Sequence, residues 1–227
     1  LNNTNNEIFL PENFSKLSPA EQQAASIRDA MLKQNFVRFL SSGKGLAVLH
    51  AGVASFRDWP EYGNIIGARF ENHPWNSGST ITLHIEDSSH SLCQVFPSSR
   101  FEVTDEIYQS VRVEDQTHPA TQHLAERFQI NDEIYQFKEF DRNKLRVLFS
   151  IDTSQIDLKN KSGIRRTDGD FALSWIKNYG KGRVFYSALG HQPDIYWNEI
   201  LLRHFLAGIQ FALGDLSAST KSIPAER

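Results

Sequence analysis

One short apolar run, residues 45–50 with the sequence GLAVLH, constrains the fold of this chain more than any other segment. It follows residues 18–40, where Ser18 and Glu21 have the spacing of a capping box, so we expect a helix there. Apolar residues at near-helical spacing give that helix a stripe: Ile27, Met31, Phe36, Val37 and Leu40. A continuous apolar run directly after a helix is typical of a parallel strand buried on both faces. The sequence therefore predicts a buried parallel strand within an α/β domain.

Further segments have the patterns of strands or helices. Residues 78–86 alternate like a strand, and residues 147–151 form a second buried strand. Residues 172–177 and 183–189 flank a YGKG turn, which indicates a hairpin, and residues 197–213 form a closing helix that Gly214 ends. We expect one domain over residues 1–214 and a polar tail over 215–227. The opening residues, LNNT, read like the loop that leaves a buried strand, so the first strand is expected to be missing from this chain.

A local repeat lies in the middle of the chain. The sequence FEVTDEIYQ at residues 101–109 returns as FQINDEIYQ at residues 128–136, an offset of 27 residues. Two copies are too few for a solenoid, so we interpret them as a duplication (residues 81–109 and 110–136) inside one domain. Only one copy can face a given site.

Composition excludes several classes of protein. The net charge of −3 and the isoelectric point near 6.3 argue against binding to nucleic acid or to an anionic membrane. No apolar run approaches the roughly 20 residues that span a bilayer, so we expect a soluble chain, in the bacterial cytoplasm or the periplasm. A lone cysteine, Cys93, excludes an internal disulfide and a thiolate-clustered zinc site.

Several motifs occur in order along the chain: GKGLAVLH at 43–50, WPEY at 59–62, HPW at 73–75, EDQTHP at 114–119, DEIY at 132–135, YGKGRVFY at 179–186 and ALGH at 188–191. In this combination the chain resembles the ThuA-like (trehalose-utilisation) family of the class I glutamine amidotransferase-like superfamily. The resemblance implies an α/β fold, a flavodoxin-like three-layer sandwich with a mainly parallel sheet. Its site would lie at the carboxyl ends of the parallel strands, as is general for open α/β sheets. It also implies a role in the metabolism of trehalose or keto-sugars.

Two histidines follow predicted strands. His50 ends the run 45–50, at the place where amidotransferase relatives hold a nucleophilic cysteine, and an imidazole there supplies an acid, a base or a metal ligand. His191 follows the strand at 183–189 and a glycine. The alternatives are a buried His50 bonded to the backbone and a solvent-exposed loop histidine at 191.

The DEIY motif supplies a carboxylate. Side chains alternate along a strand, so Glu133 and Tyr135 share one face, and Glu133 could act as a base or a metal ligand. A solvated acidic strand end is the alternative, and Glu106 is the equivalent residue of the first copy. His50, Glu133 and His191 together suit a divalent metal such as zinc with an open position. No close spacing such as HExxH supports a metal from sequence.

The predicted function is an enzyme that acts on a sugar. Trp59, His73 and Trp75 could line a sugar pocket, because an aromatic face stacks on the apolar face of a pyranose; packing in the core is the alternative. We expect a hydrolase, lyase or isomerase that uses His and Glu acid–base chemistry with or without a metal. A non-catalytic sugar-binding module is the alternative, and the oligomeric state stays open. We do not expect glutamine amidotransferase activity, because Cys93 lies in a Ser-rich stretch and not at a strand-to-helix elbow.

Overall fold

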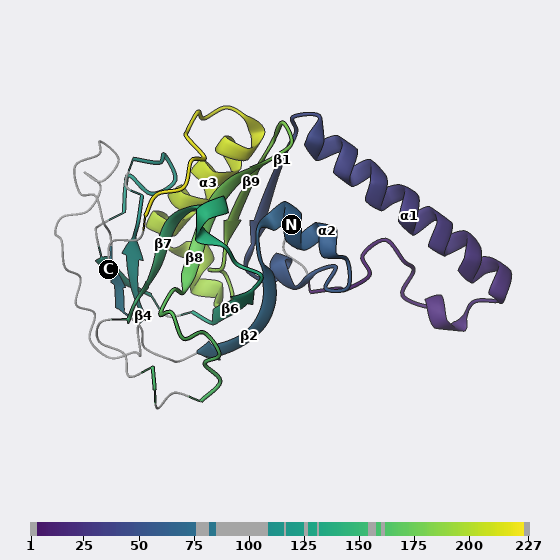
Figure 1. Cartoon of the computed structure of the whole chain (residues 1–227), viewed down its shortest axis with the longest axis horizontal. Coiled ribbons are helices and arrows are strands. Elements are labelled where there is room, and N and C mark those ends of the chain that lie inside the picture. Colours follow the sequence, from purple (N-terminus) through teal and green to yellow (C-terminus); the bar gives the residue numbers. More distant parts are fainter. Residues whose placement is uncertain are drawn as a thin grey trace.

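A mixed sheet forms the body of the molecule, and a long helix projects from it (Figure 1). The computed structural model describes residues 4–75, 82–84, 109–115, 117–124, 127–130, 132–153, 158–159 and 162–224. None of the helices in these ranges combines the length and the apolar character that crossing a bilayer requires.

The main sheet has seven described strands in the spatial order β1-β9-β8-β7-β3-β4-β5. Their bounds are Gly45–Leu49 (β1), Thr82–His84 (β3), Gln109–Val113 (β4), Arg127–Ile130 (β5), Arg146–Asp152 (β7), Ala172–Tyr179 (β8) and Gly182–Ser187 (β9). β1 and β9 are parallel, as are β3 and β4, but the other described pairs are antiparallel.

The prediction of a mainly parallel sheet is therefore wrong, and the flavodoxin-like sandwich is not confirmed. A parallel pair needs a crossover connection, usually a helix, whereas antiparallel neighbours can be joined by a tight turn. β8 and β9 form the predicted hairpin, with Tyr179 opposite Gly182. No described helix lies between β7 and β8 either.

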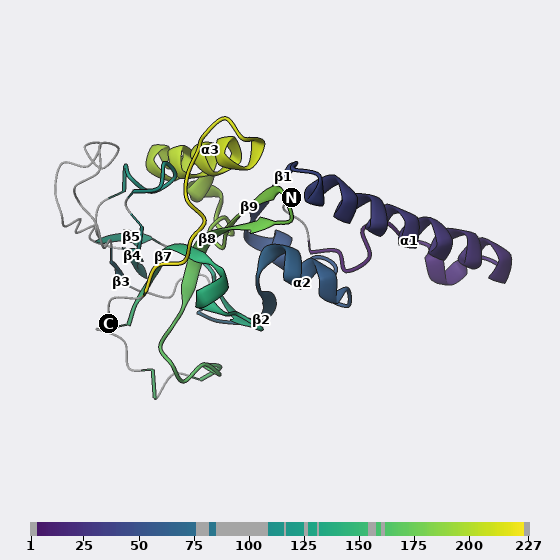
Figure 2. The ribbon, with the colours of Figure 1, turned by 45° about the horizontal axis from the view of Figure 1, so that its top comes forward.

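Two helices cover opposite faces of this sheet (Figure 2). Val184 of β9 packs with Ile65 of α2 (Pro60–Ile66). The next residue, Phe185, faces α3 (Glu199–Leu213), where a Cβ on Gly208 would lie 2.4 Å from its ring. Because neighbouring side chains of a strand point to opposite faces, α2 and α3 lie on either side of β9.

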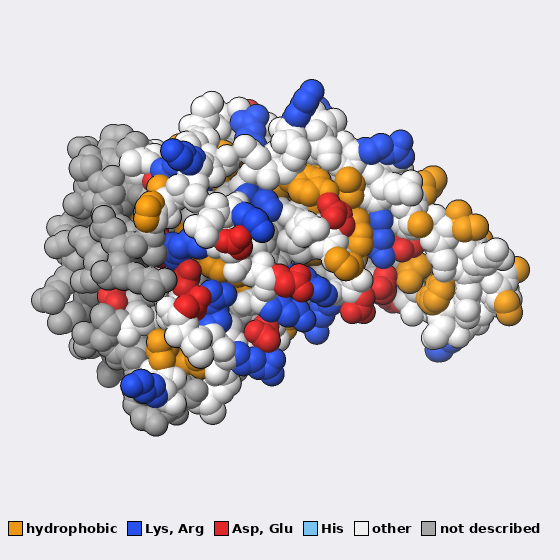
Figure 3. Space-filling view, in the orientation of Figure 1, with side chains coloured by type: hydrophobic (Ala, Val, Ile, Leu, Met, Phe, Trp, Pro, Cys, Tyr) orange, Lys and Arg blue, Asp and Glu red, His pale blue; other side chains and the backbone are white. Residues whose placement is uncertain are grey.

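The first helix, α1 (Pro19–Ser41), begins with the predicted capping box between Ser18 and Glu21. Its expected apolar stripe is only partly used. Leu40 is buried, but Ile27 and Met31 are 65% and 50% exposed. Hydrophobic side chains are visible on the projecting helix at the right of Figure 3. Only the last turns of the stripe pack against the body of the molecule, through Phe36, Val37 and Leu40.

A two-stranded ribbon, β2 (Arg69–Trp75) with β6 (Ile134–Lys138), packs on the main sheet. Phe137 of β6 lies 5.1 Å from the ring of Trp175 and 5.6 Å from that of Tyr186. The ribbon therefore shares the core, and β6 brings the last residues of the second copy of the repeat to the edge of the sheet where β1 ends.

Other sequence predictions have mixed outcomes. The strands at 45–49 and 147–151 are confirmed by β1 and β7. The closing helix starts at Glu199, after a 3-10 turn (η6, Pro193–Trp197), and ends at Gly214 with a left-handed φ of 99°. Within the expected strand at 78–86, only Thr82–His84 is described. Of the first copy of the repeat, residues 101–108 lie outside the described residues, and Gln109 begins β4.

Candidate functional site

Two neighbouring strands end at the same edge of the sheet. β1 and β9 are parallel partners, with Leu49 opposite Ser187, so the residues that follow each strand lie close together. β1 leads directly into a 3-10 helix, η2 (His50–Ala54), and His50 has a left-handed backbone with φ of 40°. Residues other than glycine rarely adopt this conformation, and such strain concentrates at functional sites.

His50 is buried and held by two hydrogen bonds. Its Nδ1 lies 2.6 Å from the carbonyl oxygen of Ala188, which follows β9. Because a carbonyl oxygen can only accept, Nδ1 carries the ring proton, and Nε2 accepts a hydrogen bond of 2.8 Å from the Tyr135 hydroxyl. Burial lowers the pKa of His50 and favours the neutral ring.

Glu133 lies at the entry to β6 and faces three imidazoles. Its Oε2 is 3.6 Å from Nε2 of His50 and 3.3 Å from Nδ1 of His191. Its Oε1 is 3.7 Å from Nδ1 of His73. One ligand atom each from His50, Glu133 and His191 lie within 4.8 Å of one another. The fold thus brings together three residues that are far apart in the sequence; we call them the His–Glu–His cluster.

The His–Glu–His cluster is buried on one side and open on the other. The side chain of His50 is 4% exposed and that of Glu133 13%, whereas those of His191 and His73 are 44% and 47% exposed. Tyr135 closes the buried side, because its ring stacks on His50 at 4.5 Å. Burial raises the pKa of Tyr135, so its hydroxyl keeps its proton. A solute can therefore reach Glu133 past the two exposed histidines.

Asp132 positions His191. Its fully buried carboxylate accepts three backbone N–H bonds, from Gly190 at 2.5 Å and from His191 and Gln192 at 2.9 Å each. Burial raises its pKa to about 6, against the lowering effect of these donors. Strand alternation directed attention to Glu133 and Tyr135, and so the sequence analysis missed this residue. Its place beside Glu133 in the DEIY motif was the available signal.

Arg57 is a second residue that the sequence analysis missed. Its Nε donates to the carbonyl oxygen of Ala54 at 3.1 Å, and its guanidinium lies 5.4 Å from the centre of the Phe70 ring. The Phe70 ring in turn lies 4.8 Å from that of Tyr135. The terminal nitrogens of Arg57 have no hydrogen bond or ion pair to any residue that the structure describes. No motif in the sequence points to this arginine.

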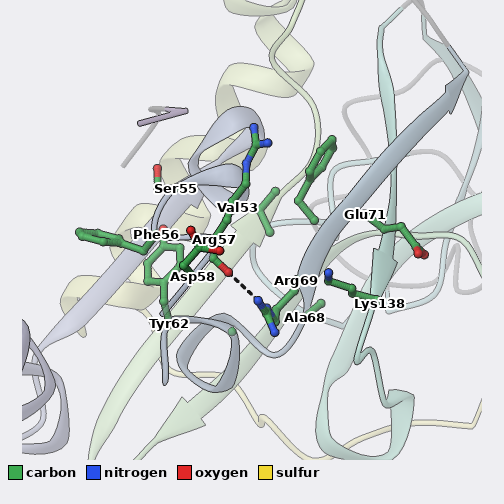
Figure 4. Close-up of a pocket in the computed structure, with 12 residues that line it drawn as sticks. Val53, Ser55, Phe56, Arg57, Asp58, Tyr62, Ala68, Arg69, Glu71 and Lys138 are labelled. Carbon is green, nitrogen blue, oxygen red and sulfur yellow. Dashed lines mark hydrogen bonds between the residues drawn. The ribbon is translucent and has the colours of Figure 1, made fainter. Parts of the chain in front are cut away.

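A cavity of about 260 Å³ lies beside this arginine (Figure 4). Arg57, Arg69 and Lys138 contribute positive charge to its lining. Arg69 is committed to the carbonyl oxygen of Arg57, the dashed line in Figure 4, and to Glu139 at 3.0 Å. The Arg57 side chain extends away from Arg69 in this view. Of these two arginines, Arg57 is the one with terminal nitrogens available for a ligand.

A comparison with models of known protein families identifies the family of this chain. The model of the ThuA family, described as trehalose utilisation, matches residues 12–112 and 109–212. This chain belongs to the ThuA family. The first matched stretch contains the copy of the repeat at residues 101–109, and the second contains the copy at residues 128–136. A search of curated protein sequences finds no match.

Solved structures share the fold of this ThuA chain. A ThuA-like protein from Bacteroides uniformis is 17% identical with a TM-score of 0.55, and the match covers 82% of this chain and 63% of the other. A ThuA-like protein from Parabacteroides merdae is 18% identical with a TM-score of 0.52, and the match covers 85% and 72%. The chain thus spans less than two thirds of the first relative's length. At these identities the likeness concerns the fold alone.

The remaining predicted residues are placed differently. His73 lies beside the His–Glu–His cluster, with its Nδ1 3.7 Å from Oε1 of Glu133. Trp59 does not join it: its ring packs against Phe36, Phe56 and Tyr62 between α1 and α2. The sugar contact of Trp59 stays a prediction, since the residue lies apart from the His–Glu–His cluster and lines a second cavity with residues of α1. The backbone of Trp75 ends β2, but its side chain lies outside the described residues, as does Glu106.

Proposed function

We propose that this ThuA chain is an enzyme that acts on trehalose or a related keto-sugar through His and Glu acid–base chemistry. One observation carries the proposal: a largely buried carboxylate, Glu133, lies within 3.3–3.7 Å of three imidazoles, two of which are open to solvent. Acids and bases so placed typically accelerate proton transfer by about 10²–10⁴-fold. The family description, trehalose utilisation, supports the class of substrate.

A 3-keto-glycoside illustrates the chemistry that this arrangement suits. Glu133 accepts the proton from C2, next to the carbonyl, and the electron pair of the broken C–H bond forms an enolate. The enolate then re-forms the carbonyl as a C1–C2 double bond forms and the C1–O bond to the aglycone breaks. His73, the solvent-exposed imidazole outside the His–Glu–His cluster, gives a proton to the leaving oxygen. The steps amount to a lyase reaction; addition of water across the new double bond makes the net result a hydrolysis.

Arg57 suits the negative charge of this enolate. A cation that is fixed before the reaction stabilises developing charge more than one that must reorganise. The guanidinium is held over Phe70 and by Ala54, and its positive charge already reaches Tyr135, whose pKa it lowers against the effect of burial. We propose that Arg57 binds the carbonyl oxygen of the sugar.

The test is turnover of disaccharides and their 3-keto forms by the purified chain, followed by chromatography of the products. We expect Glu133→Gln to abolish product formation while the far-ultraviolet circular dichroism stays unchanged. Glu139→Gln is the matched control, because Glu139 is exposed and pairs with Arg69 at the far end of β6. Full activity of Glu133→Gln would refute the proposal. Calorimetric binding of the sugars without any product would favour the non-catalytic sugar-binding module.

A further inference from the structure

We infer that Nε2 of His50, Oε2 of Glu133 and Nδ1 of His191 form a binding site for one divalent metal ion of the zinc type. The inference extends the proposed function by naming a cofactor for the same residues. It rests on the geometry of the site and can be tested without a substrate.

The distances between the donor atoms match those of a metal site. Metal–ligand bonds of about 2.0–2.1 Å in tetrahedral geometry place neighbouring donor atoms about 3.4 Å apart. Oε2 of Glu133 is 3.3 Å from Nδ1 of His191 and 3.6 Å from Nε2 of His50, and all three atoms lie within 4.8 Å of one another. A small inward movement of the half-exposed His191 side chain completes the triangle.

The chemistry of the donors also fits. Two imidazoles and one carboxylate are borderline ligands that suit zinc, manganese, iron, cobalt or nickel. Catalytic sites of this kind have three protein ligands and leave the remaining positions to water or substrate. The exposure of His191 and His73 places those open positions on the solvent side of the His–Glu–His cluster.

The surroundings orient each ligand as metal sites require. A ligating histidine usually donates its other ring N–H to a carbonyl or carboxylate, which fixes the tautomer. His50 does so through Nδ1 to the Ala188 carbonyl, which leaves Nε2 to face Glu133. The turn that carries His191 is fixed by Asp132 through the N–H groups of residues 190–192.

Among the described neighbours of the cluster, Tyr135 must give way. Its hydroxyl donates its one proton to Nε2 of His50 at 2.8 Å, and the carboxylate of Glu133 is a second acceptor close to it. When a metal takes Nε2, the hydroxyl can donate to Glu133 instead. Oε1 of Glu133, which faces His73, lies on the other side of the carboxylate and remains available to accept a proton.

The experiment measures metal uptake by the purified full chain. The protein is stripped with a chelator and titrated with Zn²⁺ by calorimetry and with Co²⁺ by visible absorption, whose bands report the coordination geometry. We expect one ion per chain. His50→Ala, Glu133→Gln and His191→Ala should each weaken binding by more than about 100-fold, since even outer-shell partners contribute 10–100-fold. Glu139→Gln, the matched control at an exposed carboxylate beyond β6, should bind within a few-fold of wild type.

Each outcome decides between the two proposals. Failure of the wild type to take up either ion, or uptake that the His191→Ala and Glu133→Gln variants retain, overturns the metal site. If His50→Ala fails to fold, the variant at the half-exposed His191 still tests the site. Stoichiometric metal without sugar turnover leaves this inference standing and removes the proposed function. Turnover by chelator-treated protein that afterwards takes up neither ion does the reverse.

Discussion

Replacement of Asp132 by asparagine tests how the His–Glu–His cluster is held in place. Oδ2 of Asp132 accepts the N–H of Gly190 at 2.5 Å, and Oδ1 accepts those of His191 and Gln192 at 2.9 Å each. Asparagine has nearly the same shape, but only one of its two terminal atoms accepts hydrogen bonds. With its oxygen in the Oδ1 position it keeps two bonds and turns its NH₂ group against the N–H of Gly190.

The magnitude follows from this count. The exchange removes one hydrogen bond to a charged group, worth about 1.5–3 kcal/mol, and leaves a buried N–H unsatisfied, which costs about 1–3 kcal/mol. Part of the second cost is relieved if the turn moves, so we expect Asp132→Asn to lower the free energy of unfolding by about 2–4 kcal/mol. The same movement displaces His191 and should weaken Zn²⁺ binding by about 10–100-fold.

Urea unfolding followed by circular dichroism measures the first quantity, and calorimetric titration measures the second. Asp194→Asn is the matched control, because Asp194 is an exposed carboxylate on the turn that follows. Its effect on unfolding should stay within about 0.5 kcal/mol. If Asp132→Asn behaves like Asp194→Asn in both assays, Asp132 does not hold the His191 turn and the reasoning fails.

Three other perturbations have defined outcomes. Arg57→Ala should lower kcat for the sugar by about 10²–10³-fold, and Arg57→Lys should recover part of this in steady-state kinetics; equal rates for wild type and Arg57→Ala would exclude the role in charge stabilisation. Gly190→Ala should melt well below Gly169→Ala in thermal unfolding, since both have positive φ but only at Gly190 would a Cβ meet an atom at 2.5 Å, the Tyr196 hydroxyl. Three buried histidines should make the fold acid-sensitive. Burial lowers the pKa of His118 and of His123 to about 4 and that of His204 to about 3. In the unfolded chain these histidines have a pKa near 6.5, so below this pH the unfolded state binds protons that the folded state does not bind. The free energy of unfolding should therefore fall as the pH drops from about 6.5 towards 4. The raised pKa of Asp132 acts in the opposite direction, but it is one group against three. Equal unfolding free energies at pH 7 and pH 5 would contradict this.

Local signals in the sequence predicted local structure well. The capping box of Ser18 and Glu21, the apolar run of β1 and the YGKG turn each depend on residues close together in the chain, and all three are present. The direction of the strands could not be predicted in the same way. A parallel β1 was inferred from its apolar character and a mainly parallel sheet from the family resemblance. The described antiparallel pairing of β7 with β3, β4 and β8 depends on long-range connections that no short window records.

The candidate site shows the same division. His50 and His191 were identified because each follows a strand, and the parallel pairing of β1 with β9 brings those two strand ends together. Glu133 was identified from its motif, although the strand begins only at Ile134. Trp59 was grouped with the site from its aromatic character, which gives the same signal whether a residue packs in a core or contacts a ligand; in the fold its ring packs apart from the His–Glu–His cluster. Asp132 and Arg57 act through backbone groups and a ring that only the tertiary structure brings near.

The distribution of backbone strain argues that these contacts are more than incidental packing. Among the described residues, three that are not glycine have a positive φ: His50, Phe56 and Glu139. Two of them belong to the candidate site, since His50 is a member of the His–Glu–His cluster and Phe56 immediately precedes Arg57, whereas Glu139 lies beyond the far end of β6. Left-handed residues of this kind persist only where the surrounding structure over-determines them, at a cost of about 1–3 kcal/mol each. A fold that merely buried His50 against Ala188 would have no need for that strain, whereas one that aims Nε2 of His50 at Glu133 does.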